Sequence, residues 1–265
     1  MTFTSEHRGG AGEPLVLLHG FSDTWRTWEL VLPALERHHD VLALTLPGHA
    51  GGPPLPNPLS TDAVLGAVER SLDAHGIELA HIAGNSLGGY LALRLAARAR
   101  ARSVVALAPA GGWAEGDPAV PGLFALQAGL VAALRTGAPQ VQAMLATPAG
   151  RRRATALIVE HADHIPAGLI AGLALGAAAA APSLTALLEA AARETWELDA
   201  ARVDCPVRIV WGTADKLLPW PAAAVRYRTE WLPHADWVEL DGVGHAPQLD
   251  VPLEAAQLIL GLTSR

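Results

Sequence analysis

Short apolar runs alternate along the chain with longer segments of helical length, and this alternation constrains the fold more than any other sequence feature. Each run is long enough for one strand and is apolar on both faces, as strands of a covered parallel sheet are. The pattern predicts an α/β fold with a mostly parallel central sheet and helices on both faces. The six runs are Leu15–Leu18, Val41–Leu46, His81–Ala83, Val104–Ala108, Val207–Trp211 and Trp237–Leu240.

The segments between these runs have amphipathic helical spacing. They are Trp28–Arg37, Thr61–His75, Leu87–Arg100, Pro219–Trp231 and Pro252–Leu262. The alternation stops once, because residues 112–198 are rich in alanine, leucine and glycine and contain no convincing strand. This predicts a helical cap, 112–198, inserted into a core of residues 1–111 and 199–265. The Gly- and Pro-rich stretch Gly48–Pro58 is expected to be an exposed loop beside the ligand site.

Charge and cysteine content exclude several classes of function. The net charge of -7 offers no basic stripe for nucleic acid. Cys205 is the only cysteine, so no intramolecular disulfide can form, and a buried thiol is expected. Residues 1–12 lack the apolar core of a signal peptide, which predicts a cytoplasmic protein. The uncharged run Ile165–Ala181 is bracketed by proline and is weakly hydrophobic, so we expect a buried cap helix and no membrane insertion.

The strongest chemical signal is the pentapeptide Gly84-Asn85-Ser86-Leu87-Gly88, which follows a predicted strand and opens a predicted helix. A serine on such a sharp turn needs small neighbours, because the backbone is strained and crowded. The turn also places the hydroxyl at a helix N-terminus, where free amides favour a developing anion. This context predicts a nucleophilic Ser86.

A serine hydroxyl needs a histidine to take its proton, and the histidine needs a carboxylate to fix its tautomer. Asp215 follows the strand Val207–Trp211, and His245 follows the strand Trp237–Leu240, so both are expected at the same sheet edge as Ser86. The loop after the strand Val104–Ala108 has no carboxylate, which leaves Asp215 as the acid.

Five motifs in order resemble the α/β-hydrolase superfamily over nearly the whole chain outside the cap. They are His19-Gly20-Phe21, Pro47-Gly48-His49, Gly84 to Gly88, Gly212 to Asp215, and Gly244-His245. The resemblance implies that the amides of Phe21 and Leu87 form an oxyanion hole and that His19 is structural. Relatives with aspartate at the elbow, the dehalogenases and epoxide hydrolases, use a different nucleophile, so their chemistry is not expected with serine at position 86.

Other polar and aromatic clusters have plainer interpretations. Glu160–His164 has the spacing of metal ligands but is expected to be the solvated face of a cap helix, so neither a metal nor any other cofactor is predicted. Arg151–Arg153 is expected to be solvated, although one arginine could turn inward to a substrate carboxylate. Ser22 and Trp113 are the candidate pocket residues.

These features predict a serine hydrolase that cleaves a carboxylic ester of a small to medium, largely apolar substrate through an acyl-enzyme on Ser86. The expected partner is that small molecule, and a homodimer is left open. Alternatives are hydrolysis of a carbon-carbon bond in a vinylogous diketo acid, lactone hydrolysis, perhydrolysis, and a ligand receptor without turnover. Ala246 stands where the carbon-carbon hydrolases usually have an aromatic residue.

Overall fold

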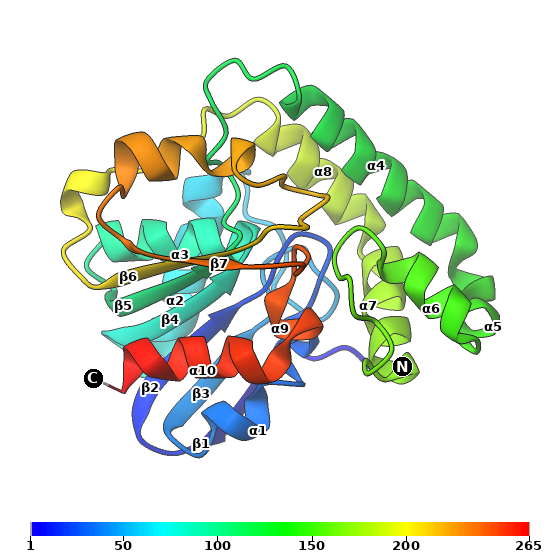
Figure 1. The fold of residues 1–265 in the computed structure, drawn as a ribbon, viewed down its shortest axis with the longest axis horizontal. Coiled ribbons are helices and arrows are strands. Elements are labelled where there is room, and N and C mark those ends of the chain that lie inside the picture. Colours follow the sequence, from blue (N-terminus) through cyan, green and yellow to red (C-terminus); the bar gives the residue numbers. More distant parts are fainter. Residues whose placement is uncertain (1, 265) are drawn as a thin grey trace.

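The computed structural model describes residues 2–264, and seven strands form one sheet through its centre (Figure 1). The strand order is β1-β3-β2-β4-β5-β6-β7, and every neighbouring pair is parallel except β1 with β3. This confirms the predicted α/β fold. The strands are β1 (Glu6–Gly10), β2 (Glu13–Leu18), β3 (His39–Leu44), β4 (Ala80–Asn85), β5 (Ala101–Leu107), β6 (Val207–Gly212) and β7 (Asp236–Leu240).

The antiparallel strand β1 has no counterpart among the predicted strands, because its sequence, Glu-His-Arg-Gly-Gly, contains no apolar run. It is the edge strand of the sheet and its side chains are only partly buried, so it does not need an apolar run. Its side chains form ion pairs instead: His7 contacts Glu36 at 2.6 Å and Arg8 contacts Asp40 at 2.6 Å. Strand β1 is therefore held in position by its backbone hydrogen bonds to β3 and by these side-chain contacts.

Helices cover both faces of the sheet and create two apolar cores. Helices α2 (Thr61–Ala74) and α3 (Leu87–Ala97) pack on one face, whereas α1 (Leu32–Leu35) and α10 (Pro252–Thr263) pack on the other. The remaining short elements are α9 (Pro247–Asp250), the 3-10 turns η1 (Trp25–Trp28), η2 (Ala138–Gln140), η3 (Ala200–Arg202) and η4 (Ala222–Ala224), and the π turn η5 (Tyr227–Trp231).

Two predicted helices differ from the prediction in length or in type. The segment Trp28–Arg37 contains only the last residue of η1 and the one-turn helix α1, which has Pro33 in its first turn. The segment Pro219–Trp231 is helical from Ala222 to Trp231, but the helix type changes from the 3-10 turn η4 through Val225 and Arg226 to the π turn η5. Proline lacks an amide hydrogen and crowds the preceding turn, so Pro33 and Pro221 fit only at the start of a helix.

Between β5 and β6 the described chain forms five α-helices and no strand, and these helices lie together beside the sheet (Figure 1). Nearly all of the run Ile165–Ala181 forms one helix, α7, as predicted, and its last residue begins α8, which meets α7 at an angle of 73°. The five are α4 (Val120–Gly137), α5 (Val141–Leu145), α6 (Pro148–Thr155), α7 (Ala167–Ala179) and α8 (Ala181–Ala191).

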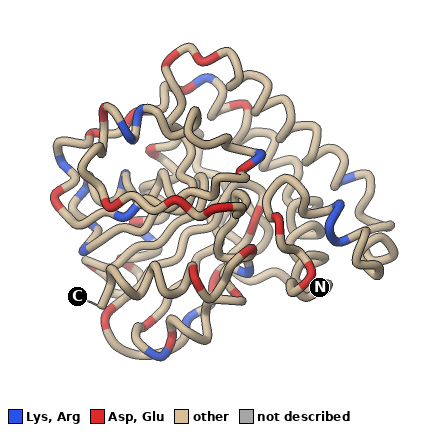
Figure 2. Tube along the Cα trace, viewed as in Figure 1, with Lys and Arg blue, Asp and Glu red and all other residues tan. Residues whose placement is uncertain are grey.

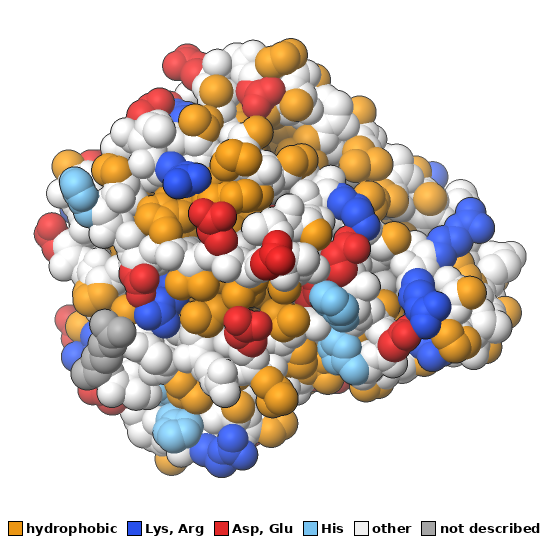
Figure 3. Space-filling view, viewed as in Figure 1, with side chains coloured by type: hydrophobic (Ala, Val, Ile, Leu, Met, Phe, Trp, Pro, Cys, Tyr) orange, Lys and Arg blue, Asp and Glu red, His pale blue; other side chains and the backbone are white. Residues whose placement is uncertain are grey.

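Helix α4 turns an uncharged face to solvent. Among the described residues, the stretch Val120–Leu145 is the one helix long and apolar enough to cross a membrane, and 6% of its most apolar window is buried. Leu126 and Leu130 remain 41% and 38% exposed. Figure 2 shows α4 nearly free of charged residues, and Figure 3 shows hydrophobic side chains on this part of the surface. The absence of membrane insertion stays a prediction.

Candidate active site

Ser86 lies on a sharp turn between β4 and α3. Its backbone has φ 54° and ψ -117°, a conformation that is strained for any residue other than glycine. A Cβ atom at Gly84 would overlap the carbonyl of Gly88, and one at Gly88 would overlap the carbonyl of Leu18. The two glycines therefore let the turn pack directly against β2 and its own helix.

Asp215 and His245 form a buried pair at the ends of β6 and β7. Asp215 Oδ2 lies 2.7 Å from His245 Nδ1, while its Oδ1 accepts hydrogen bonds from the amides of Leu217 and Leu218 at 2.8 and 2.7 Å. The Asp215 side chain is completely enclosed. A carboxylate fixed in this way keeps the proton of His245 on Nδ1, so Nε2 presents a lone pair.

Ser86 and His245 both line a cavity of about 620 Å³. Nε2 of His245 is buried and makes no hydrogen bond with any residue that the structure describes. Gly20 packs close to the serine, because a Cβ there would lie 3.2 Å from Ser86 Cβ. The structure thus brings the three predicted residues Ser86, Asp215 and His245 together at one edge of the sheet.

The rest of this cavity is mainly apolar and is lined largely by the segment 112–198. Helices α4 and α7 contribute aliphatic side chains, among them Leu130, Val131, Leu134, Ile170 and Leu173. A cavity of this size and character accommodates an apolar small molecule. Because this segment supplies most of these side chains, it determines the shape of the space in front of Ser86.

A few polar side chains also face the cavity. The predicted pocket residue Ser22 is one, and its amide donates to Nε2 of His49 at 3.3 Å. Asp23 is the next, and burial raises the pKa of its carboxyl to about 7. Arg153 lines the cavity as well, whereas Arg152 is exposed and paired with Asp163 at 2.5 Å. Arg152 and Arg153 are both exposed, as predicted, whereas Arg151 is half-buried and donates to the carbonyl of Leu145 at 3.1 Å.

The loop after β2 is fixed by two buried histidines. His19 lies 2.7 Å from the carbonyl of Gly20 through Nδ1, and its Nε2 accepts from the amide of Leu46 at 2.9 Å. Burial and the neighbouring His49 hold the pKa of His19 well below its usual range. With both ring nitrogens occupied, His19 is not available as a general base, and it ties the loop to the end of β3.

The predicted oxyanion residues are placed on either side of the turn. Leu87 is the first residue of α3, so its amide has no partner within the helix. Phe21 follows Gly20, which packs against Ser86. Both are positioned to offer an amide near the serine, and their role in catalysis stays a prediction.

Trp113 does not line either of the two cavities that adjoin this site. It is 9% exposed and packs edge to face against Trp196, with ring centroids 5.1 Å apart. Trp196 lines a second, smaller cavity instead. The space beside Gly111 and Gly112, just after β5, is occupied by the side chains of Trp196 and Tyr227 and not by a ligand site. Trp113 is therefore a packing residue.

A buried polar chain behind the site was not predicted from the sequence. Gln248 donates through Nε2 to Thr27 Oγ1 and to Asn85 Oδ1, both at 3.2 Å. Asn85 in turn donates to the carbonyl of His245 at 3.0 Å. These bonds join three loops that are far apart in sequence. A glutamine three positions after the histidine is the only local signal of this arrangement.

The segment Glu160–His164 is a loop and not the predicted helix, although its four polar residues are exposed as predicted. No cluster of potential metal ligands is found in residues 2–264. The segment is instead anchored by Asp250, which accepts hydrogen bonds from the amides of Glu160 and His161 at 3.0 and 2.6 Å. Asp250 also accepts from the amide of Gly244 at 2.7 Å. It therefore connects this segment to the loop that carries His245.

The comparisons with known proteins agree with this geometry. Residues 13–252 match the family model described as the alpha/beta hydrolase fold. Epoxide hydrolase EphH of Mycobacterium tuberculosis is 33% identical over 209 residues, covering 76% of this chain and 94% of that protein. The pimeloyl-[acyl-carrier protein] methyl ester esterase of Chromobacterium violaceum is 31% identical over 252 residues, covering 91% and 90%.

The fold also has close counterparts among solved structures. A membrane phospholipase A, described as a bacterial virulence factor, superimposes with a TM-score of 0.78 at 21% identity, covering 100% of this chain and 85% of that one. The fold and the site together are those of a hydrolase whose mostly parallel sheet is covered by helices on both faces. The chain belongs to the α/β-hydrolase family.

Proposed function

We propose that this hydrolase is a serine esterase that cleaves a carboxylic ester of a small to medium, largely apolar substrate. The observation that carries the proposal is the arrangement of Ser86 and His245 on one apolar cavity, with Asp215 bonded to the far side of the imidazole. Similarity over most of the chain to a methyl ester esterase supports the ester class.

In this mechanism Ser86 Oγ attacks the ester carbonyl while His245 Nε2 accepts the hydroxyl proton. The Asp215 carboxylate stabilises the imidazolium that forms. The carbonyl oxygen becomes an anion between the amides of Phe21 and Leu87, and each donor can contribute on the order of 3 kcal/mol to the transition state.

The protonated His245 then gives its proton to the departing alkoxide oxygen, and the acyl group remains on Ser86. Water enters the cavity, loses a proton to Nε2 and attacks the acyl-enzyme. The serine oxygen leaves with the proton from His245, which restores the resting state. No step requires a cofactor.

Similarity to a protein named as an epoxide hydrolase favours a second candidate reaction. Opening an epoxide through an alkyl-enzyme ester requires a carboxylate nucleophile, and Ser86 cannot supply one. Of the acids near the site, Asp215 is occupied by His245, and Asp23 carries a raised pKa that lowers its nucleophilicity near neutral pH. These features favour ester cleavage over epoxide opening.

The test measures p-nitrophenyl acetate and butyrate, styrene oxide and a vinylogous diketo acid as substrates, together with labelling by a fluorophosphonate. Wild type is expected to be labelled and to hydrolyse the esters, and Ser86→Ala to lose labelling and at least about 10³ in turnover. Ser183→Ala, on α8 and outside both cavities, is the matched control and should keep both.

Two results would overturn the proposal in different ways. Labelling without ester turnover, but with cleavage of the diketo acid, assigns the site to a carbon-carbon bond. Epoxide turnover that survives Ser86→Ala assigns catalysis to a carboxylate.

A further inference from the structure

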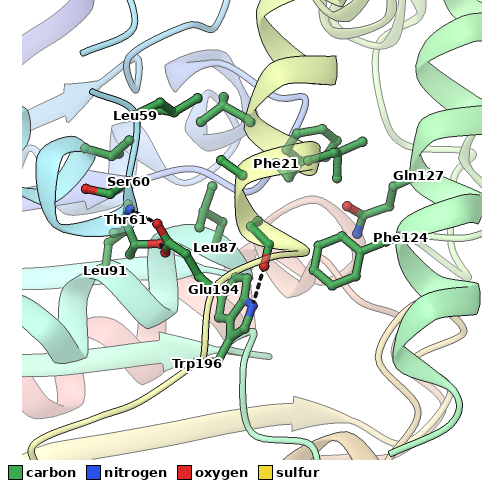
Figure 4. Close-up of a pocket in the computed structure, with 15 residues that line it drawn as sticks. Phe21, Leu59, Ser60, Thr61, Leu87, Leu91, Phe124, Gln127, Glu194 and Trp196 are labelled. Atoms are coloured by element: carbon green, nitrogen blue, oxygen red, sulfur yellow. Dashed lines mark hydrogen bonds between the residues drawn. The ribbon is translucent and has the colours of Figure 1, made fainter. Parts of the chain in front are cut away.

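A second, smaller cavity of about 60 Å³ adjoins the catalytic one (Figure 4). Two side chains, Phe21 and Gln127, line both cavities, so they separate one from the other. The small cavity also contains Leu87, from the start of α3. It therefore touches both residues whose amides are proposed to hold the oxyanion.

The catalytic pair lies on one side of this partition only. Ser86 and His245 line the large cavity and do not line the small one. The leaving oxygen of an ester must come within hydrogen-bond reach of His245 Nε2 to receive its proton. The alcohol part of the substrate therefore occupies the large cavity. The carbonyl oxygen faces the amides of Phe21 and Leu87, so the acyl substituent extends in the remaining direction, past the Phe21 and Gln127 side chains that the two cavities share.

The small cavity is mainly apolar, and most of its polar side chains already have hydrogen-bond partners. The carboxylate of Glu194 accepts from the amide of Thr61 at 2.8 Å and from its hydroxyl. The indole of Trp196 donates to the carbonyl of Ala191 at 3.2 Å, and Ser60 caps the start of α2 by accepting from an amide at 3.1 Å. Figure 4 shows both the Glu194 and the Trp196 bonds. A charged or strongly polar group would find few open partners here.

The volume limits what can enter. One water-sized group needs up to roughly 15 Å³ of such space, so the cavity holds about four of them at that size. Phe124 and Leu187 close it on the side of α4 and α8. A chain much longer than four carbons would have to displace these side chains.

We propose that the small cavity is the acyl subsite of the enzyme and accepts a short, linear, apolar acyl group of about two to four carbons. This inference rests on the proposed esterase function, and it assigns the bulky part of the substrate to the alcohol. The preferred substrates are thus short-chain esters of large apolar alcohols.

The test varies the two parts of the ester separately. With p-nitrophenol as the alcohol, kcat/KM is measured for acetate, butyrate and octanoate esters. Wild type is expected to prefer acetate and butyrate over octanoate by at least tenfold. With acetate as the acyl group, 2-naphthylmethyl acetate is expected to exceed ethyl acetate, because both release an alkanol of similar leaving ability and differ mainly in size.

Two variants and a control test whether the small cavity causes this preference for short acyl groups. Ala191→Leu fills the cavity and should lower the butyrate-to-acetate ratio of kcat/KM at least tenfold. Ala192→Leu changes the neighbouring exposed residue and should leave the ratio within twofold. Phe124→Ala enlarges the cavity and should raise octanoate relative to butyrate.

The failures of the two proposals are distinguishable. If esters are hydrolysed but octanoate matches butyrate in wild type, or Ala191→Leu and Ala192→Leu give the same ratios, the acyl subsite lies elsewhere and the esterase function stands. If Ala191→Leu does not fold, the wild-type series and Phe124→Ala decide the matter. If no ester is hydrolysed, the proposed function itself is wrong, and the acyl subsite with it.

Discussion

Replacing Asp250 by alanine tests how the segment Glu160–His164 is attached to the loop that carries His245. The carboxylate is completely enclosed and accepts from three backbone amides. Alanine cannot accept a hydrogen bond, so all three donors lose their partner at once. The effect of Asp250→Ala on stability can be worked out from the exposure of those donors.

The amide of Gly244 is buried, and an unsatisfied buried donor costs about 1–3 kcal/mol. The amides of Glu160 and His161 are partly buried and can reach water, so each loses only a net hydrogen bond of about 0.5–1.5 kcal/mol. Asp250→Ala should therefore lower the free energy of unfolding by about 2–6 kcal/mol. For a chain of this size that corresponds to a loss of at least about 4 °C in Tm.

The assay is urea denaturation followed by tryptophan fluorescence, with kcat for p-nitrophenyl butyrate measured in parallel. His161→Ala removes only the exposed ring that contacts the same carboxylate at 3.0 Å and should cost less than about 1 kcal/mol. Asp199→Ala, at an exposed acid, controls for the lost charge. We also expect kcat to fall in Asp250→Ala, because Gly244 precedes the catalytic histidine.

A loss below 1 kcal/mol in Asp250→Ala, or a loss no larger than in His161→Ala, would refute this reasoning. It would mean that other contacts, such as the bond from the Ala246 amide to the Ile158 carbonyl at 2.9 Å, hold the segment without the carboxylate.

Three further predictions concern the catalytic site and its turn. Asp215→Asn should lower kcat by up to roughly 10⁴ by favouring the wrong tautomer of His245, and an effect under threefold in steady-state kinetics would place the acid elsewhere. The pKa of Asp23 rises from 3.8 to about 7 on folding, so the contribution of this carboxyl to stability should fall between about pH 4 and pH 7. Asp23→Asn should remove this fall, and urea curves at pH 4 and pH 8 should show a gain at pH 8 only. Gly88→Ala should abolish fluorophosphonate labelling or folding, because its Cβ would overlap the backbone of β2, whereas Gly122→Ala, in open space, should be labelled like wild type.

The central architecture follows from local features of the sequence. A strand covered on both faces is mostly apolar, so the residues Leu15–Leu18 of β2 and Ile209–Trp211 of β6 are visible as runs of adjacent apolar residues. The turn at Ser86 must have glycine where two backbones touch. Such requirements are visible within a few residues of sequence, and chain order then places Ser86, Asp215 and His245 after the ends of β4, β6 and β7.

Features that depend on partners distant in sequence could not be predicted in this way. The polar strand β1 becomes a strand because β3 offers it hydrogen bonds and Glu36 and Asp40 neutralise its charges. The Glu160–His164 segment has the periodicity of a helix, yet its amides bond to Asp250, about ninety positions away.

The sequence by itself determined the family, the sheet and the three residues that meet at its edge, because each is specified by short-range constraints on packing and backbone conformation. Only the tertiary structure decided what surrounds them. Trp113 packs against Trp196, and Trp196 lines the small cavity. Both roles depend on how α4 and α8 pack against the core, which the local sequence does not specify. The boundary between the large cavity and the small one is formed by Phe21, from the loop after β2, and Gln127, from α4, which are far apart in the sequence.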